Sequence, residues 1–284
     1  MTLLEILRRS ADYLTRAGVP SARLEADVLL AHALGLGRID LYLQFERPLT
    51  EPDLTQMRSL LRRRVQGTPL AYLIGEREFF GLRFAVREGV LIPRPESELV
   101  VELALARLAA KGAPTVAADL GTGSGCIGIA IAVRAPSTRV DEVDISDTAV
   151  KVASSNAAQL GVSDRVTILQ GSWGRPLKGR GPYDLVVSNP PYVTSAELLD
   201  LDPGVRDFEP ALALDAGPDG LAPYRELMEE LPELAGPHAT VLLEVDPSRA
   251  GAVAQLASEK WTSAEPKLHH DLSGRERVLE VTLA

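Results

Sequence analysis

Residues that build disulfides and metal centres are scarce in this chain. Its 284 residues include one cysteine, Cys126, and four histidines. A single cysteine excludes an internal disulfide and a cysteine-rich metal cluster. Four histidines leave little material for a zinc site, so we expect no bound metal.

Long apolar runs are missing as well. No stretch approaches the roughly 18 consecutive apolar residues that a membrane-spanning helix requires. Residues 1–9 predict an amphipathic helix, and their charges follow the apolar stretch, which is not the layout of a signal peptide. We therefore expect a cytoplasmic protein with no membrane association.

Basic residues are in deficit over most of the chain, whose net charge is −9. Only residues 1–87 carry more arginine and lysine than aspartate and glutamate, and the remainder is strongly acidic. An acidic domain binds a phosphate backbone poorly, so we expect no stable complex with nucleic acid. The one basic run, Arg62–Arg64, is either a solvated helix face or a contact with RNA or a partner.

The hydrophobic pattern changes twice along the chain. Apolar residues recur at helical spacing over residues 1–70, which predicts a small N-terminal helical bundle. Short aromatic and branched runs separated by glycine predict a linking β-hairpin over residues 71–92. Strands and helices then alternate over residues 93–284, which predicts an α/β domain with a parallel, doubly wound sheet. The expected strands are residues 116–120, 139–145, 165–169, 183–188, 239–245, 265–270 and 276–283.

A glycine-rich loop joins the first of these strands to the next helix. Residues Asp119–Gly128 are Asp-Leu-Gly-Thr-Gly-Ser-Gly-Cys-Ile-Gly. Open α/β sheets bind ligands at this carboxyl edge, and glycine permits a tight turn and a close approach of the backbone. The loop alone leaves a dinucleotide, a nucleotide, S-adenosylmethionine or a plain strand–helix turn open.

Two carboxylates narrow that choice. Asp144 ends the second strand, where a carboxylate can accept both hydroxyls of a ribose, although it could instead cap the following helix. Asp119 precedes the first glycine, where it would repel a pyrophosphate but suit the cationic methionine end of S-adenosylmethionine. The pair therefore favours S-adenosylmethionine.

The motif Ser188-Asn189-Pro190-Pro191-Tyr192 follows the fourth strand. The Asn189 side-chain oxygen and the Pro190 carbonyl can each accept one N–H of a substrate NH2 group and orient its nitrogen. Tyr192 can stack on a flat group, and the prolines hold the carbonyls fixed. The motif predicts methyl transfer to a planar nitrogen, most simply a glutamine side-chain amide, with an ordinary proline turn as the alternative.

Together these motifs resemble those of the HemK/PrmC family, the release factor glutamine methyltransferases. The resemblance covers nearly the whole chain. The Asn-Pro-Pro-Tyr motif is shared with adenine and guanine amino-methyltransferases, whereas Ile92–Glu96 joined to a helical front domain is more specific. The matching segments are residues 69–81, 91–98, 119–125, 189–192, 209–214 and 219–221.

The resemblance implies a Rossmann-like class I methyltransferase sheet with a small N-terminal helical domain that recognises a release factor. It implies S-adenosyl-L-methionine as the cofactor and, as substrate, the glutamine of the Gly-Gly-Gln motif of class I peptide chain release factors. The expected cofactor-binding residues are Asp119, Gly121, Thr122, Gly123, Gly125, Asp144, Trp173 and Asn189. The expected substrate-binding residues are Asn189, Pro190, Pro191 and Tyr192, of which Asn189, Pro190 and Tyr192 are expected to be catalytic.

Some positions depart from the family pattern. Glu142 stands where a small or apolar strand residue is usual, and Ser172 stands where aspartate is common. Trp173 could instead be a core tryptophan. Three other functions stay open: a methyltransferase acting on a ribosomal-protein glutamine, a nucleic-acid amino-methyltransferase acting on a flipped base, and a non-catalytic binding module that keeps the fold.

Overall fold

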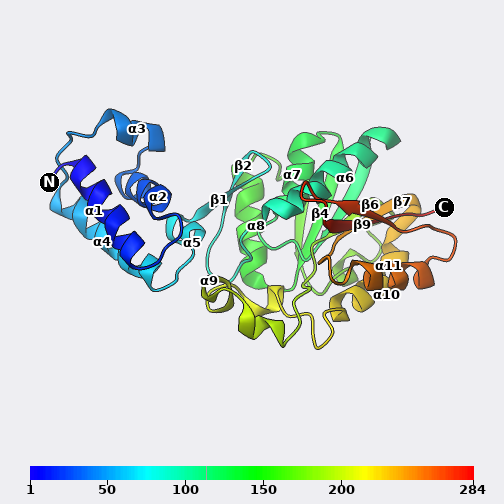
Figure 1. The fold of residues 1–284 in the computed structure, drawn as a ribbon. Coiled ribbons are helices and arrows are strands. Elements are labelled where there is room, and N and C mark those ends of the chain that lie inside the picture. The colour runs from blue at the N-terminus through cyan, green and yellow to red at the C-terminus, as the bar shows by residue number, and fades with distance from the viewer. Residues whose placement is uncertain (113) are drawn as a thin grey trace. The chain divides into compact units, whose positions relative to one another are not determined.

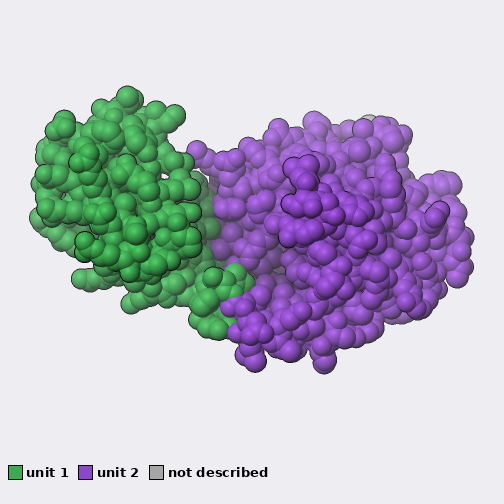
Figure 2. Space-filling view, in the orientation of Figure 1, with its two compact units in different colours: residues 1–76, 202–208 green, residues 77–201, 209–284 purple. Residues whose placement is uncertain are grey.

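The computed structural model describes residues 1–112 and 114–284. The chain forms two compact units, one made of residues 1–76 and 202–208 and the other of residues 77–201 and 209–284 (Figure 2). No helix in the described part of the chain is long and apolar enough to cross a bilayer.

The first unit is helical (Figure 1). Its helices are α1 (Leu3–Arg16), α2 (Ala22–Leu34), α3 (Arg38–Leu43), α4 (Glu51–Val65), α5 (Leu70–Ile74) and α9 (Pro203–Arg206). The hydroxyls of Thr2 and Thr50 accept a backbone N–H in the first turns of α1 and α4, which stabilises each helix start by about 1 kcal/mol. Leucines of α1, α2 and α4 form a separate apolar core. This unit therefore has its own hydrophobic core.

The basic run of α4 is divided between two roles. The Arg64 guanidinium donates two hydrogen bonds to the Glu25 carboxylate, from Nε at 2.5 Å and from Nη2 at 3.2 Å. Arg62 and Arg63 are exposed. Arg64 thus ties α4 to α2, whereas Arg62 and Arg63 are exposed to solvent.

The hairpin is shorter than the sequence pattern predicts. It consists of β1 (Glu76–Phe79) and β2 (Leu82–Ala85), whereas residues 71–74, which we expected within it, belong to α5. The prediction was wrong at this end because Pro69 starts a helical turn and Gly75 ends it in the left-handed conformation.

The second unit contains a seven-stranded sheet of order β5-β4-β3-β6-β7-β9-β8. Its strands are β3 (Thr115–Leu120), β4 (Thr138–Asp144), β5 (Val166–Gln170), β6 (Tyr183–Ser188), β7 (Ala235–Glu244), β8 (Lys267–His270) and β9 (Glu276–Thr282). All seven expected strands are present. The first five are parallel, but β9 pairs antiparallel with both β7 and β8, so the sheet is mixed and not wholly parallel as predicted. A short turn joins β8 to β9, and strands joined in this way must run in opposite directions.

Helices cover both faces of this sheet. The helices are α6 (Glu98–Lys111), α7 (Cys126–Arg134), α8 (Asp147–Gln159), α10 (Ala222–Leu234) and α11 (Ala250–Lys260). Residues of α6, α7 and α8 share one apolar cluster with alternate strand residues such as Ala117, and α10 and α11 share another with residues such as Ala118. A sheet buried on both faces explains why its central strands are almost continuously apolar.

The sheet order brings the sequence motifs together. In the register of the central strands, Leu120 at the end of β3 lies between Val143 of β4 and Ser188 of β6. The glycine loop, Asp144 and the Asn-Pro-Pro-Tyr motif follow these three neighbouring strands. They therefore emerge at one carboxyl edge, where the strand order reverses.

Candidate active site

The glycine loop turns sharply between β3 and α7. Gly121 and Gly125 have φ angles of +74° and +81°, a left-handed conformation that side chains disfavour. A Cβ added to Gly125 would lie 2.5 Å from Ile129 Cδ1, and one added to Gly121 would lie 3.3 Å from Trp173 Cζ3. The loop thus keeps its backbone close both to a side chain of helix α7 and to the indole of Trp173.

Asp119 holds this loop from below. Its Oδ2 accepts hydrogen bonds from the Thr122 hydroxyl at 2.8 Å and from the Gly128 N–H at 3.0 Å. The side chain is buried, and burial raises the pKa of Asp119 to about 6. The carboxylate that we expected to meet the cofactor therefore lies beneath the loop and outside the cavity wall.

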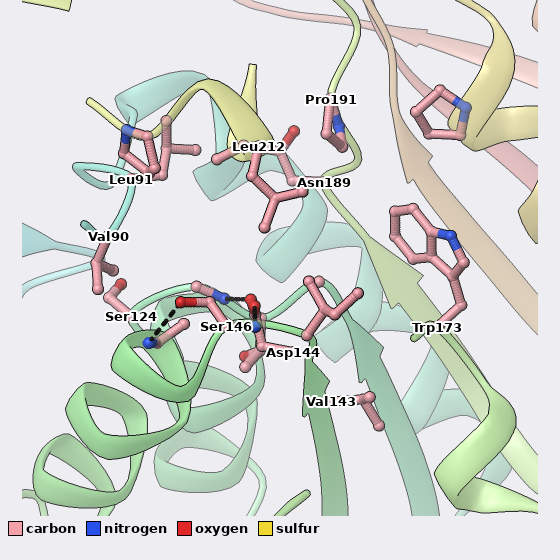
Figure 3. Close-up of a pocket in the computed structure, with 18 of the residues that line it drawn as sticks. Val90, Leu91, Ser124, Val143, Asp144, Ser146, Trp173, Asn189, Pro191 and Leu212 are labelled. Carbon is pink, nitrogen blue, oxygen red and sulfur yellow. Dashed lines mark hydrogen bonds between the residues drawn. The ribbon is translucent and has the colours of Figure 1, made fainter. Parts of the chain in front are cut away.

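Asp144 lies at the cavity, at the end of β4 (Figure 3). Its Oδ2 accepts the Gly123 N–H and its Oδ1 accepts the Ser146 N–H, both at 2.8 Å. Burial raises its pKa above the usual value. Each carboxylate oxygen keeps a second lone pair for a ligand hydroxyl. The helix-cap role belongs instead to Ser146, whose hydroxyl accepts the Ala149 N–H at the start of α8.

The Asn-Pro-Pro-Tyr motif contributes two of its four side chains to the cavity, those of Asn189 and Pro191. Asn189 Nδ2 donates to Ser97 Oγ at 3.1 Å, and no described residue donates to its Oδ1. Pro190 is buried. Tyr192 packs on the apolar cluster of α10 and α11, where burial raises its pKa to about 12. The side chains of Pro190 and Tyr192 therefore support the turn and do not line the cavity.

One cavity of about 350 Å³ connects these parts. Its wall includes Gly121, Thr122 and Gly123 of the loop, together with Asp144 and Asn189, whereas Asp119 and Gly125 are not part of it. This volume is within the range of small-molecule sites. The glycine loop and the asparagine motif therefore share one pocket (Figure 3).

Trp173 both lines the cavity and packs on the core. Its indole N–H donates to Glu226 Oε2 at 2.7 Å, and its φ of +46° is unusual for a tryptophan. It also contacts the apolar cluster beneath α10. Trp173 thus belongs both to the core and to the cavity wall.

Several cavity residues were not singled out from the sequence. Ile145 and Leu212 line the cavity with side chains that are 53% and 61% exposed. Arg94 also lines it, and its Nη2 lies 2.5 Å from Glu209 Oε1, which belongs to a carboxyl group that also accepts the Ile92 N–H at 3.0 Å. The position of Ile145, directly after Asp144 at the end of a strand, was the one feature of the sequence that could have indicated its role. Arg94 and Glu209 lie in two segments that matched the family, but their pairing was not visible.

These residues fit S-adenosylmethionine. The Gly121 position leaves space that a side chain would fill, and the free lone pairs of Asp144 suit ribose hydroxyls. The exposed side chain of Ile145 and the indole of Trp173 offer apolar surfaces for a flat base. No cluster of metal-ligating side chains occurs within residues 1–112 and 114–284. The fold and this pocket define an S-adenosylmethionine-dependent methyltransferase of class I.

Comparison with known proteins specifies the family. Residues 5–75 match the PrmC N-terminal domain and residues 98–201 match the methyltransferase small domain. The release factor glutamine methyltransferase of Rhodopirellula baltica is 40% identical over 287 residues, covering 100% of this chain and 97% of the relative. That of Geobacter sulfurreducens is 42% identical over 259 residues, covering 90% and 88%. The chain belongs to the family of release factor glutamine methyltransferases.

A solved structure supports the fold. The S-adenosylmethionine-dependent methyltransferase from Agrobacterium tumefaciens is similar with a TM-score of 0.50 at 14% identity. The match covers 73% of this chain and 69% of that one. At this identity the likeness concerns the fold alone.

Replacing Asp144 with alanine is expected to weaken binding of S-adenosylmethionine by about 10–100-fold. Each lost hydrogen bond to a charged group is worth about 1.5–3 kcal/mol, and 1.4 kcal/mol is a tenfold change in affinity. Isothermal titration calorimetry measures the change. Asp147→Ala, at an exposed position that does not line the cavity, is the matched control. Equal dissociation constants for the two variants would contradict the ribose role of Asp144.

Proposed function

We propose that this enzyme transfers the methyl group of S-adenosylmethionine to the side-chain amide nitrogen of the glutamine in the Gly-Gly-Gln motif of class I release factors. The observation that supports this most strongly is the single cavity shared by the glycine loop, Asp144 and Asn189. The names of the relatives supply the substrate class.

The substrate nitrogen is a poor nucleophile because its lone pair is delocalised into the carbonyl. Asn189 Nδ2 already donates to Ser97, so Oδ1 is the atom of this side chain that can accept a substrate N–H. The Pro190 carbonyl accepts the second N–H. These two bonds aim the nitrogen and favour the positive charge that develops on it.

The remaining pocket residues hold the methyl donor. When bound, S-adenosylmethionine supplies a methyl group on a positively charged sulfur. Asp144 binds its ribose hydroxyls, and Ile145 and Trp173 flank its adenine. The backbone of Gly121–Gly123 lies against its methionine part. The proton released from the methylated nitrogen is acidic and leaves to water, so no strong general base is needed.

Specificity for a protein substrate requires more contacts than one glutamine provides. We assign this role to residues 1–70, the helical bundle that matches the PrmC N-terminal domain. Residues 71–92 link it to the methyltransferase domain, residues 93–284, with the hairpin itself limited to Glu76–Ala85. The helical bundle would therefore bind the release factor outside its glutamine motif.

Incubating a class I release factor with the enzyme and S-adenosylmethionine is expected to add one methyl group. Mass spectrometry of the Gly-Gly-Gln peptide should show an increase of about 14 mass units, because one hydrogen is replaced by CH3. A release factor whose motif glutamine is replaced by glutamate is the control, since that residue has no side-chain amide nitrogen to methylate. Methylation of a ribosomal protein or of RNA, with none on the release factor, would overturn the proposal.

A further inference from the structure

A chain of hydrogen bonds runs from Asn189 into the protein interior. Asn189 Nδ2 donates to Ser97 Oγ at 3.1 Å, and Ser97 Oγ lies 2.5 Å from Glu244 Oε2. Ser97 is 2% exposed and Glu244 is fully buried. The three residues come from the turn after β6, from the turn before α6 and from the last position of β7. Glu244 lies outside the cavity wall, and Ser97 is the residue that connects it by hydrogen bonds to Asn189.

Glu244 is poorly placed to stabilise the fold. Its carboxyl accepts a hydrogen bond from Ser97 alone, and Oε1 is buried without a partner among the described residues. The Tyr224 hydroxyl donates to the backbone carbonyl of Glu244 and not to its carboxylate. A buried acid with so few partners costs free energy, which favours a functional reason for its presence.

The charged and titratable groups around Glu244 include some that raise its pKa and some that lower it. Burial, as the main cause, raises its pKa to about 7, and Glu96 adds to this. The hydroxyl of Ser97 and the charges of Arg277 and Arg94 lower it. Three further titratable groups interact with it electrostatically, Cys126, Tyr192 and Tyr224. Glu244 thus changes its protonation state near neutral pH.

Ser97 has one hydroxyl proton, so the protonation state of Glu244 sets which group donates and which accepts in each hydrogen bond from Glu244 to Asn189. An ionised Glu244 can only accept, so Ser97 donates to it and must in turn accept from the NH2 of Asn189. Asn189 Oδ1 is then the atom left for the substrate. A protonated Glu244 can donate to Ser97, whose proton can then point to Asn189 Oδ1, with the amide turned over. The NH2 of Asn189 would then oppose the NH2 of the substrate, donor against donor.

We propose that Glu244, acting through Ser97, holds the side-chain amide of Asn189 with its oxygen directed to the substrate N–H. Glu244 and Ser97 are positioning residues for methyl transfer. This inference rests on the proposed function, because it requires Asn189 to accept a hydrogen bond from a substrate amide.

Kinetics with the release factor test the proposal. Glu244→Gln and Ser97→Ala are each expected to lower kcat by about 10–100-fold, the effect of a misdirected reacting group, with little change in KM or in affinity for S-adenosylmethionine. Ser97→Thr keeps the hydroxyl and should restore most of kcat. The double variant Glu244→Gln, Ser97→Ala should lose no more than either single variant, because the two residues act in series.

The pH profile separates positioning from a structural role. The kcat of the wild-type enzyme should fall on the acid side of an inflection near pH 7, as Glu244 takes up a proton. Glu244→Gln should lose that inflection. Glu280→Gln changes another buried glutamate, one that pairs with Arg107 and His269, and should keep the wild-type profile. An unchanged kcat in Glu244→Gln, or the same inflection in it, overturns the proposal.

A readout independent of turnover completes the test. The side-chain NH2 signals of Asn189 in 15N NMR spectra, identified by their loss in Asn189→Ala, should titrate near pH 7 in the wild type and not in Glu244→Gln. Signals that do not titrate in the wild type would contradict the hydrogen-bond chain. If the wild type methylates no release factor, the proposed function fails, while this measurement still reports on the Asn189 amide by itself.

Discussion

Asn189→Ala should lower kcat for release factor methylation by about 10²–10³-fold, the usual effect of removing one preorganised polar group from a transition state. The amide oxygen of Asn189 is one of two acceptors that we assign to the substrate NH2. Without it the nitrogen is held at one point only and is free to turn from the methyl donor. Single-turnover kinetics with excess enzyme isolate this step from substrate binding and product release.

Two measurements show that the loss concerns chemistry. Calorimetry should give an S-adenosylmethionine affinity close to that of the wild type, because Asp144 and the glycine loop are unchanged. The melting temperature should fall by only a few degrees, since one hydrogen bond to Ser97 is removed. Full activity in Asn189→Ala would discard the assigned mechanism.

Glu142→Gln should stabilise the protein at pH 8 by about 1–3 kcal/mol, because an amide has no ionised form to give up on burial and each unit by which burial raises a carboxyl pKa corresponds to about 1.4 kcal/mol. Glu142 lies directly opposite Asp119 in the register of β4 and β3, and it is fully buried. Neither of its carboxylate oxygens has a hydrogen-bond partner among the described residues. The space is filled closely, because a Cβ on Gly128 would lie 2.4 Å from Glu142 Oε1, so the substitution must preserve shape.

The gain should depend on pH. Burial, with the charge of Asp119 as a second cause, raises the pKa of Glu142 well above its usual value. The folded protein therefore holds a proton that the unfolded chain releases. The stability from this group is complete below the ordinary pKa of glutamate and declines as pH rises toward the raised value. Urea unfolding at several pH values should show the advantage of Glu142→Gln vanishing near pH 4. An advantage that is constant across pH would contradict this account.

The departure of Glu142 from the family pattern was visible in the sequence, but its setting was not. The sequence alone shows that Glu142 stands between Asp141 and Val143 in an expected strand, and no more. Only the pairing of β3 with β4 and the covering helix α7 place it against Asp119 and Gly128. The same pairing puts Asp119 beneath the glycine loop, where its carboxylate accepts a hydrogen bond from the Thr122 hydroxyl and does not line the cavity.

The order of motifs along the chain was sufficient for much of the site. Strand–helix alternation predicts parallel strands, and parallel strands present their carboxyl ends at one edge. From that alone the glycine loop, Asp144 and Asn189 could be expected to meet, and they line one cavity. The hairpin was predicted too long, and the antiparallel insertion of β9 was not foreseen. Both depend on turns and edge pairing that local patterns specify weakly.

By itself, then, the sequence determined the elements, their alternation and the chemical groups at the strand ends, since these depend on periodicity and on contacts close in the chain. Tertiary structure alone decided which of those groups face the cavity and which support it. Ser97, Asn189 and Glu244 are far apart in sequence, and only the packing of β6, β7 and the turn before α6 joins them. A hydrogen bond depends on the positions of two atoms, and for distant residues those positions are set by the folding of everything between them.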